Sequence, residues 1–130
     1  LVSFPGWLNE DQGSASLAAS RVVAMPSLWD EPFGLSAAEA LMHGKPVVAS
    51  NIGFLGEMIV NGKNGFVVPP NDPASLASSL LRVIDMSETD YLRMASLGRA
   101  DAAENFGMSG CVSSYRGIYS QLIRVRQSDG

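Results

Sequence analysis

The chain has 130 residues, of which 46% are hydrophobic and 17% charged, a composition typical of one globular domain or of a piece of a larger protein. Its net charge of -4 and its scattered Lys and Arg residues argue against a nucleic-acid partner. The single cysteine, Cys111, excludes an intrachain disulfide and fits a reducing compartment, so we expect a cytoplasmic protein. We also expect no membrane span, because no apolar stretch approaches the roughly 18 residues that one requires.

Short apolar runs indicate strands at residues 1–4 (LVSF), 21–25 (RVVAM), 46–50 (PVVAS) and 65–68 (GFVV). The first three do not alternate between polar and apolar residues, which is typical of strands buried on both faces of a parallel sheet. Because helix-sized spacers separate the runs, the order of elements predicts an α/β fold with a Rossmann-like, doubly wound parallel sheet, followed by C-terminal helices.

Capping residues indicate where the first helices begin and end. A helix over residues 35–43 is expected to stop at Gly44, and Pro46 prevents its continuation. Asp72 followed by Pro73 predicts the start of a helix that runs to about residue 84.

Two further helices are expected in the C-terminal part. Ser87 opens one that extends to about residue 105, with Asp90 as its capping partner. Ser109 can cap the last helix, over residues 109–130. Its apolar side chains recur at helical spacing and need a packing partner: they are Val112, Tyr115, Ile118, Tyr119, Leu122 and Ile123.

The segment DEPFGLSAAEA, residues 30–40, carries two carboxylates around a turn and a helix start. Pro32 favours extended backbone at Glu31, which places this residue beyond the carboxyl end of the strand 21–25, where parallel sheets bind ligands. Glu31 can therefore contact the hydroxyl groups of a sugar.

The predicted helix start supplies the remaining groups for a sugar nucleotide. Free backbone N–H groups at Leu35, Ser36 and Ala37 favour a diphosphate. Glu39, in the first turn, can accept hydrogen bonds from a ribose diol. Trp7 can stack on the nucleobase or pack in the core.

Simpler interpretations stay open. The S-x-x-E spacing of Ser36 and Glu39 also fits a capping box, in which Glu39 bonds to the backbone of its own helix. Glu31 also fits a solvated loop acid. We expect Cys111 to be a small buried residue.

The run PSLWDEPFGLSAAEALMHGKPVVAS, followed by GEMIVNGKNGFVVPPND, resembles the C-terminal, donor-binding domain of family 4 glycosyltransferases, which are retaining enzymes of the GT-B fold. Glu31 and Glu39 meet the E-x7-E signature of that family. The resemblance implies a partial nucleotide-sugar-binding domain over residues 1–108 and a helix over 109–130 that packs toward a separate N-terminal domain. It also implies transfer of a hexose from a nucleoside diphosphate sugar to an acceptor sugar or lipid held by that domain.

The same resemblance implies roles for individual residues. Glu31 would be the catalytic contact to the transferred sugar, Glu39 would hold the ribose hydroxyls, and Phe33, Gly34 and Leu35 would present backbone to the donor. Together with the helix start, the expected substrate-binding residues are Glu31, Phe33, Gly34, Leu35, Ser36 and Glu39. Family members need no metal, so we expect no metal and no cofactor besides the donor substrate.

Two departures from the family pattern leave other functions open. Where the family usually has G-G-x-P-E, this chain has Gly53-Phe54-Leu55-Gly56-Glu57, and we expect Phe54 to narrow the acceptor side or to reshape the loop. The Arg and Lys clamp on the diphosphate lies upstream of the motif in the family, so we expect the chain alone to be inactive. A non-catalytic GT-B-like binding or assembly module and a GT-B-fold nucleotide-sugar epimerase are the alternatives.

Overall fold

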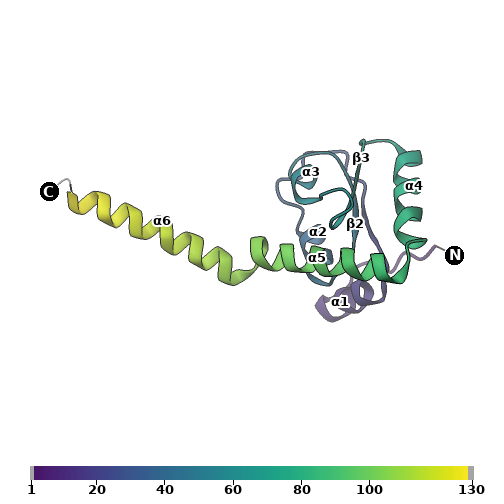
Figure 1. Cartoon of the computed structure of the whole chain (residues 1–130), viewed down its shortest axis with the longest axis horizontal. Helices are drawn as coiled ribbons and strands as arrows, with labels where there is room; N and C mark the ends of the chain where they lie inside the picture. The colour runs from purple at the N-terminus through teal and green to yellow at the C-terminus, as the bar shows by residue number, and fades with distance from the viewer. Residues whose placement is uncertain (1, 129–130) are drawn as a thin grey trace.

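The structure is a computed structural model that describes the backbone of residues 2–128 and the side chains of residues 2–124. A 3-stranded parallel sheet lies at its centre, in the order β1-β2-β3 (Figure 1). The strands are β1 (Val23–Met25), β2 (Val47–Ser50) and β3 (Gly65–Val68). They coincide with three of the predicted apolar runs, and β2 is buried along its whole length because it pairs on both sides.

Helices cover both faces of this sheet, as expected for a doubly wound fold. Successive residues of a strand point to opposite faces. Val47 and Ala49 of β2 accordingly join one apolar cluster, while Val48 joins the other. The first cluster contains residues of α2 (Leu35–Met42) and α3 (Leu55–Met58), and the second contains residues of α4 (Pro73–Ile84). Helix α5 (Glu88–Phe106) contributes to both, with Tyr91 and Met94 in the second cluster and Ala102 in the first.

The two remaining helices lie at the ends of the described chain. Helix α1 (Glu10–Ala19) begins with a capping box between Asn9 and Gln12 and precedes β1. Helix α6 (Met108–Ser128) projects away from the body toward the C-terminus (Figure 1). The predicted apolar side chains of α6 are exposed, and their packing against a separate domain stays a prediction.

Three expectations about the chain ends are wrong. Residues 2–4 form no strand, and Val2 and Phe4 are 79% and 92% exposed, because no neighbouring strand pairs with them within the described chain; Leu1 lies outside the described residues. Ser109 does not cap α6, since the Gly107 carbonyl already accepts the Cys111 N–H group and starts the helix. Cys111 is exposed and not buried, because α6 leaves the body.

The predicted helix ends of α2, α4 and α5 are confirmed. Gly44 takes the left-handed conformation after α2, with φ of 66°. The Ser87 side chain accepts the Asp90 N–H group at the start of α5. The Asp72 carboxylate accepts the hydroxyl of Ser75 at 2.7 Å and its N–H group at 3.0 Å, and so caps α4.

These bonds give the Asp72 carboxylate a role in acid stability. The hydroxyl of Ser75, and to a smaller extent its N–H group, hold the pKa of Asp72 below its ordinary value, because hydrogen bonds from both groups favour the charged carboxylate. Since the folded pKa is lower than the unfolded pKa of about 4, the carboxylate stabilises the fold above that pH. Its contribution is lost as the pH falls through the folded pKa.

We therefore expect Asp72→Asn to reduce the free energy of unfolding near pH 7 and to have little effect once the wild-type carboxylate is protonated. Urea unfolding of both proteins across the acid range measures this difference. Ser75→Ala removes the hydroxyl bond and keeps the N–H bond, so it should show part of the same pH dependence. An equal loss of stability at every pH would contradict the prediction.

Among residues 2–128, no helix combines the length and the hydropathy that crossing a membrane requires. The cytoplasmic location and the division of the chain at residue 108 stay predictions.

Candidate functional site

Glu31 lies half-buried in the loop between β1 and α2. Its Oε1 atom accepts hydrogen bonds from the Trp29 indole at 3.0 Å and from the Ser27 hydroxyl at 3.3 Å. No hydrogen bond to Oε2 forms within the described chain, and Glu31 lines a hollow of about 370 Å³ in front of α2. A freely solvated loop acid does not fit this arrangement. The sequence analysis did not identify Ser27 as a partner of Glu31, although a hydroxyl four positions before Glu31 is a local signal for this hydrogen bond.

The start of α2 is shaped by Gly34, which is buried and has a left-handed φ of 84°. A Cβ atom at this position would lie 2.7 Å from Leu55 Cδ2, so the turn requires glycine. The Gly34 carbonyl accepts the N–H groups of Ala37 and Ala38 at 3.0 and 3.2 Å. The expected set of three free N–H groups is therefore wrong at Ala37.

Two N–H groups, those of Leu35 and Ser36, have no acceptor within the described chain. Both belong to the first turn of α2, where the helix dipole adds partial positive charge. Such a pair of donors suits an anionic oxygen.

The capping-box interpretation of Ser36 and Glu39 is wrong. Helix α2 begins after Gly34 with no side-chain cap, so Ser36 is already inside the first turn and cannot act as the N-cap. Glu39 is exposed, and its carboxylate forms no hydrogen bond within the described chain, whereas its backbone carbonyl accepts the His43 N–H group. Its carboxylate lines a second hollow of about 790 Å³ between α1 and α2.

The two hollows meet at Ser36, which lines both. The loop before α2 thus carries Glu31, and α2 carries the free N–H groups and then Glu39. This is the order that the sequence analysis expected. Trp7 lines the hollow of Glu39 and is 96% exposed. It does not pack in the core, which leaves its ring free to stack on a ligand.

The charges around these hollows are unbalanced. The described linings include the carboxylates of Glu31 and Glu39 and no Lys or Arg side chain. Lys45 follows the opposite end of α2 and donates to the Ala18 carbonyl at 2.8 Å. For a diphosphate, the described lining supplies the partial charge at the start of α2 and the imidazole of His43. No group of His, Cys, Asp and Glu in the described chain could hold a metal ion, and metal independence stays a prediction.

Phe54 lies in an aromatic cluster with Phe33 and Phe106. Its ring stacks on Phe33 with the centroids 5.6 Å apart, and it lies 6.3 Å from the ring of Phe106. It lines neither hollow, so narrowing of the acceptor side gains no support. The alternative expectation, that Phe54 reshapes the loop, agrees with its position beside Phe33.

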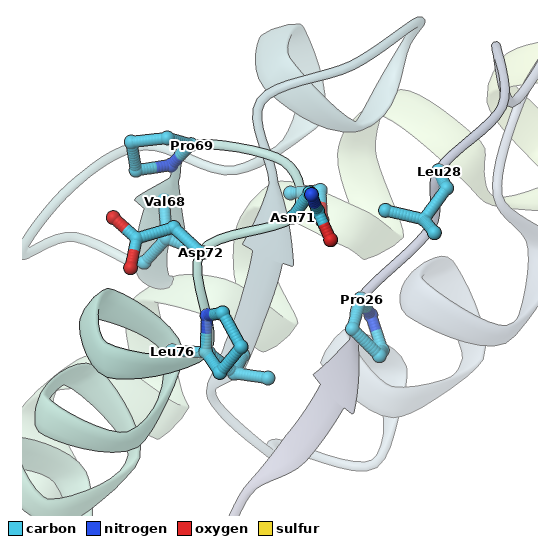
Figure 2. Close-up of a pocket in the computed structure, with 9 residues that line it drawn as sticks. Pro26, Leu28, Val68, Pro69, Asn71, Asp72 and Leu76 are labelled. Carbon is cyan, nitrogen blue, oxygen red and sulfur yellow. The ribbon is translucent and has the colours of Figure 1, made fainter.

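A third hollow, of about 210 Å³, lies where the carboxyl ends of the strands converge. Figure 2 shows Pro26 and Leu28 on one side and Asn71, Asp72 and Leu76 on the other. Its lining is mostly apolar, and the Asp72 carboxylate is engaged in capping α4. This hollow therefore offers few groups for holding a nucleotide, and the paired hollows beside α2 are the better candidate site.

Comparison with known proteins identifies the family of the chain. Residues 1–100 match the family described as Glycosyl transferases group 1. The chain belongs to this family. Its narrower assignment to family 4 and to the retaining enzymes stays a prediction.

Curated relatives of this group 1 glycosyl transferase chain are longer proteins. Glycogen synthase from Mycobacterium tuberculosis is 43% identical over 82 residues, which are 63% of this chain and 20% of the relative. A D-inositol 3-phosphate glycosyltransferase from Streptomyces avermitilis is 33% identical over 129 residues, which are 98% of this chain and 27% of the relative. The chain thus spans less than a third of the length of these relatives.

Solved structures confirm the predicted fold class. Sucrose-phosphate synthase from Thermosynechococcus elongatus superimposes with a TM-score of 0.84 at 28% identity, over 95% of this chain and 30% of its own. HepE from Anabaena in complex with UDP gives a TM-score of 0.77 at 31% identity, over 82% of this chain and 29% of its own. The same protein has also been solved with UDP-glucose. The group 1 chain therefore has the α/β, Rossmann-like architecture of the C-terminal part of a GT-B glycosyltransferase.

Proposed function

We propose that this chain is the donor-binding part of a retaining glycosyltransferase that transfers a hexose from a nucleoside diphosphate sugar. The acceptor, a sugar or a lipid, would lie on a separate N-terminal domain. The observation that carries the proposal is the alignment of Glu31, two free N–H groups and Glu39 beside α2, next to the exposed ring of Trp7. Complexes of the similar protein HepE with UDP and UDP-glucose support a nucleotide-sugar ligand.

Each group has a chemical task in this proposal. Glu39 accepts hydrogen bonds from the ribose hydroxyls, and Trp7 offers a face for the base. The N–H groups of Leu35 and Ser36 bind phosphate oxygens, where negative charge grows as the diphosphate leaves. Glu31, held through Oε1 by Ser27 and Trp29, presents Oε2 to a hydroxyl of the hexose and orients the sugar.

The transfer itself breaks the bond between the anomeric carbon and the β-phosphate oxygen. A bond from the acceptor oxygen to the same carbon forms with retention of configuration, and the proton of the acceptor hydroxyl passes to the departing diphosphate oxygen. No metal enters this scheme. The chain alone would bind the donor without transferring it, because the acceptor and the basic diphosphate clamp would be supplied from outside the described residues.

Calorimetric titration with UDP, ADP and GDP and with UDP-glucose, ADP-glucose and GDP-mannose tests the proposal. We expect one nucleotide series to bind and Glu39→Gln to weaken both members by about tenfold or more, because each lost hydrogen bond to a charged group is worth roughly 1.5–3 kcal/mol. Glu31→Gln should weaken the sugar conjugate and leave the free nucleotide nearly unchanged. Glu104→Gln, an exposed acid on α5, is the matched control.

Several outcomes would contradict the proposal. Failure of every nucleotide to bind, or wild-type affinity in Glu39→Gln, would remove its basis. Binding with no transfer when the acceptor domain is present would favour the non-catalytic module. An epimerised nucleotide sugar as the product would favour the epimerase.

A further inference from the structure

Three phenylalanine rings from distant parts of the sequence meet beside the candidate site. Phe33 belongs to the loop that carries Glu31, Phe54 precedes α3, and Phe106 ends α5. The rings of Phe33 and Phe54 stack at an interplanar angle of 16°. Phe106 meets Phe33 edge-on at 5.3 Å and Phe54 at 6.3 Å. All three are half-buried, so the cluster joins the Glu31 loop to two helices.

The backbone beside Phe54 also holds Glu31. The Phe54 N–H group donates to the Glu31 carbonyl at 3.0 Å. At the preceding residue, Gly53, a Cβ atom would lie 2.6 Å from both the N and the O atom of Glu31. The two loops are therefore in contact through their main chains, and Glu31 is fixed on one side by this contact.

We propose that Phe54 is a positioning residue for Glu31, acting through Phe33; this inference rests on the proposed function. The hydrogen bond from the Phe54 N–H group anchors Glu31, and the Phe54 ring anchors Phe33, two residues further on. Pro32 between them has a restricted φ. Because Glu31 and Phe33, on either side of Pro32, are both held, the backbone that directs the Glu31 carboxylate toward the hollow has little conformational freedom.

The effect of the ring can be separated from that of the backbone. Phe54→Gly would keep the N–H group that donates to Glu31 and remove the ring, whereas Phe54→Tyr would keep both. Glu39 lies on α2 and is not a member of this aromatic cluster. Loss of the ring should therefore disturb the contact of Glu31 with the sugar and leave the contact of Glu39 with the ribose intact.

The test compares the affinities of UDP with UDP-glucose and of ADP with ADP-glucose in wild type, Phe54→Leu, Phe54→Gly and Phe54→Tyr. For the pair that binds, we expect Phe54→Leu and Phe54→Gly to weaken the sugar conjugate about three- to tenfold relative to the free nucleotide, as the loss of aromatic pairs implies. Phe54→Tyr should restore the wild-type ratio. Phe66→Leu removes a buried ring from the opposite face of the sheet and should leave the ratio unchanged.

A measurement without ligand uses the indole of Trp29, which donates to Glu31 Oε1. In a Trp7→Phe background, which removes the second indole, the indole N–H resonance of Trp29 reports this hydrogen bond, and we expect it to shift in Phe54→Gly and to stay in place in Phe54→Tyr. Phe66→Leu in the same background should leave the Trp29 signal unchanged from that of Trp7→Phe alone.

The outcomes distinguish this inference from the proposed function. If the wild type binds neither nucleotide pair, the proposed function fails and the positioning role fails with it. If the wild type binds and Phe54→Leu changes both ligands by the same factor, or neither, the donor site stands and the positioning role is overturned. An unchanged Trp29 indole N–H resonance in Phe54→Gly would also overturn it.

Discussion

Gly53→Ala is expected to lower the free energy of unfolding by about 2–4 kcal/mol and to weaken binding of the nucleoside diphosphate sugar. Two costs add at this position. Gly53 has φ of 52°, a left-handed conformation that L side chains rarely adopt, and its new Cβ would lie 2.6 Å from the N and O atoms of Glu31. Because both neighbours are main-chain atoms, the two loops must separate, and Glu31 must move with them.

Gly62→Ala is the matched control for this change. Gly62 has a similar positive φ of 75°, but a Cβ added there would meet nothing within 4 Å. It should show only the conformational cost of about 1–2 kcal/mol and bind the donor normally. Urea unfolding and calorimetric titration of both variants measure the difference. Equal destabilisation and unchanged donor binding would mean that the close packing against Glu31 has no consequence.

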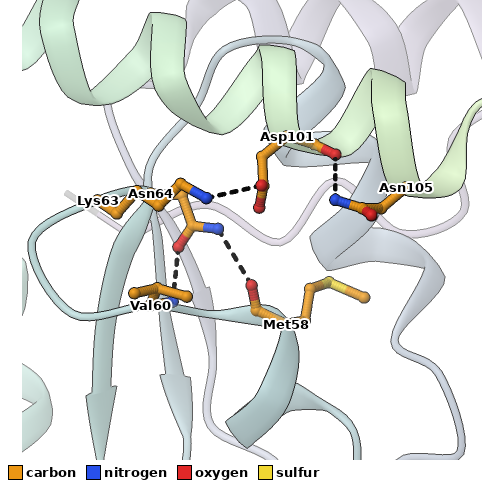
Figure 3. A network of polar contacts seen from close by, with 6 residues as sticks. All are labelled: Met58, Val60, Lys63, Asn64, Asp101 and Asn105. Atoms are coloured by element: carbon orange, nitrogen blue, oxygen red, sulfur yellow. Dashed lines mark hydrogen bonds and ion pairs between the residues drawn. The ribbon is translucent and has the colours of Figure 1, made fainter.

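Asn64→Ala is expected to lower the free energy of unfolding by about 2–4 kcal/mol, because it leaves buried backbone groups without partners. Asn64 is 0% exposed. Its Oδ1 atom accepts the Val60 N–H group at 2.8 Å, and its Nδ2 atom donates to the Met58 carbonyl at 3.0 Å (Figure 3). The side chain thus closes the turn between α3 and β3 from within, and alanine cannot replace either bond.

Asn61→Ala is the control for Asn64→Ala. The Asn61 side chain also accepts a backbone N–H group, that of Val67 at 2.8 Å, but Asn61 is exposed. Water can replace that bond, so we expect a loss below about 1 kcal/mol in the unfolding experiment. A similar loss in the two variants would show that burial of Asn64 adds nothing to its hydrogen bonds.

The same turn is tied to α5 by polar contacts. Lys63 Nζ lies 2.7 Å from Asp101 Oδ1, and Asn105 donates to the Asp101 carbonyl at 2.9 Å (Figure 3). The sequence analysis placed this segment before the predicted strand at residues 65–68 and assigned no role to its side chains. Neither the burial of Asn64 nor its partners could be predicted, because burial depends on α5, which comes later in the chain and packs over the turn.

The candidate site was predictable in part. The resemblance to a glycosyltransferase family and the spacing of Glu31 and Glu39 selected the loop and helix that line the paired hollows. The roles of these residues stay predictions. The bonds that hold Glu31 were not predicted, and neither was the place of Phe54, since its partners Phe33 and Phe106 are far apart in the sequence.

The sequence by itself determined those features that depend on neighbours within a few positions. Three of the four apolar runs became strands. Gly44, Asp72 and Ser87 ended or began helices where expected, because their hydrogen bonds or torsions involve residues three or four positions away at most. The E-x7-E spacing likewise belongs to the sequence alone.

Only the tertiary structure decided the rest. Gly34 and not Ser36 is the N-cap of α2, so the helix begins earlier than a capping box at Ser36 would allow, and the close approach of Leu55 requires glycine there. Residues 2–4 remain outside the sheet for lack of a paired strand, and α6 leaves its apolar side chains exposed. In each case the outcome depends on contacts, or on missing contacts, between segments that are distant in sequence, and no local pattern of residues carries that information.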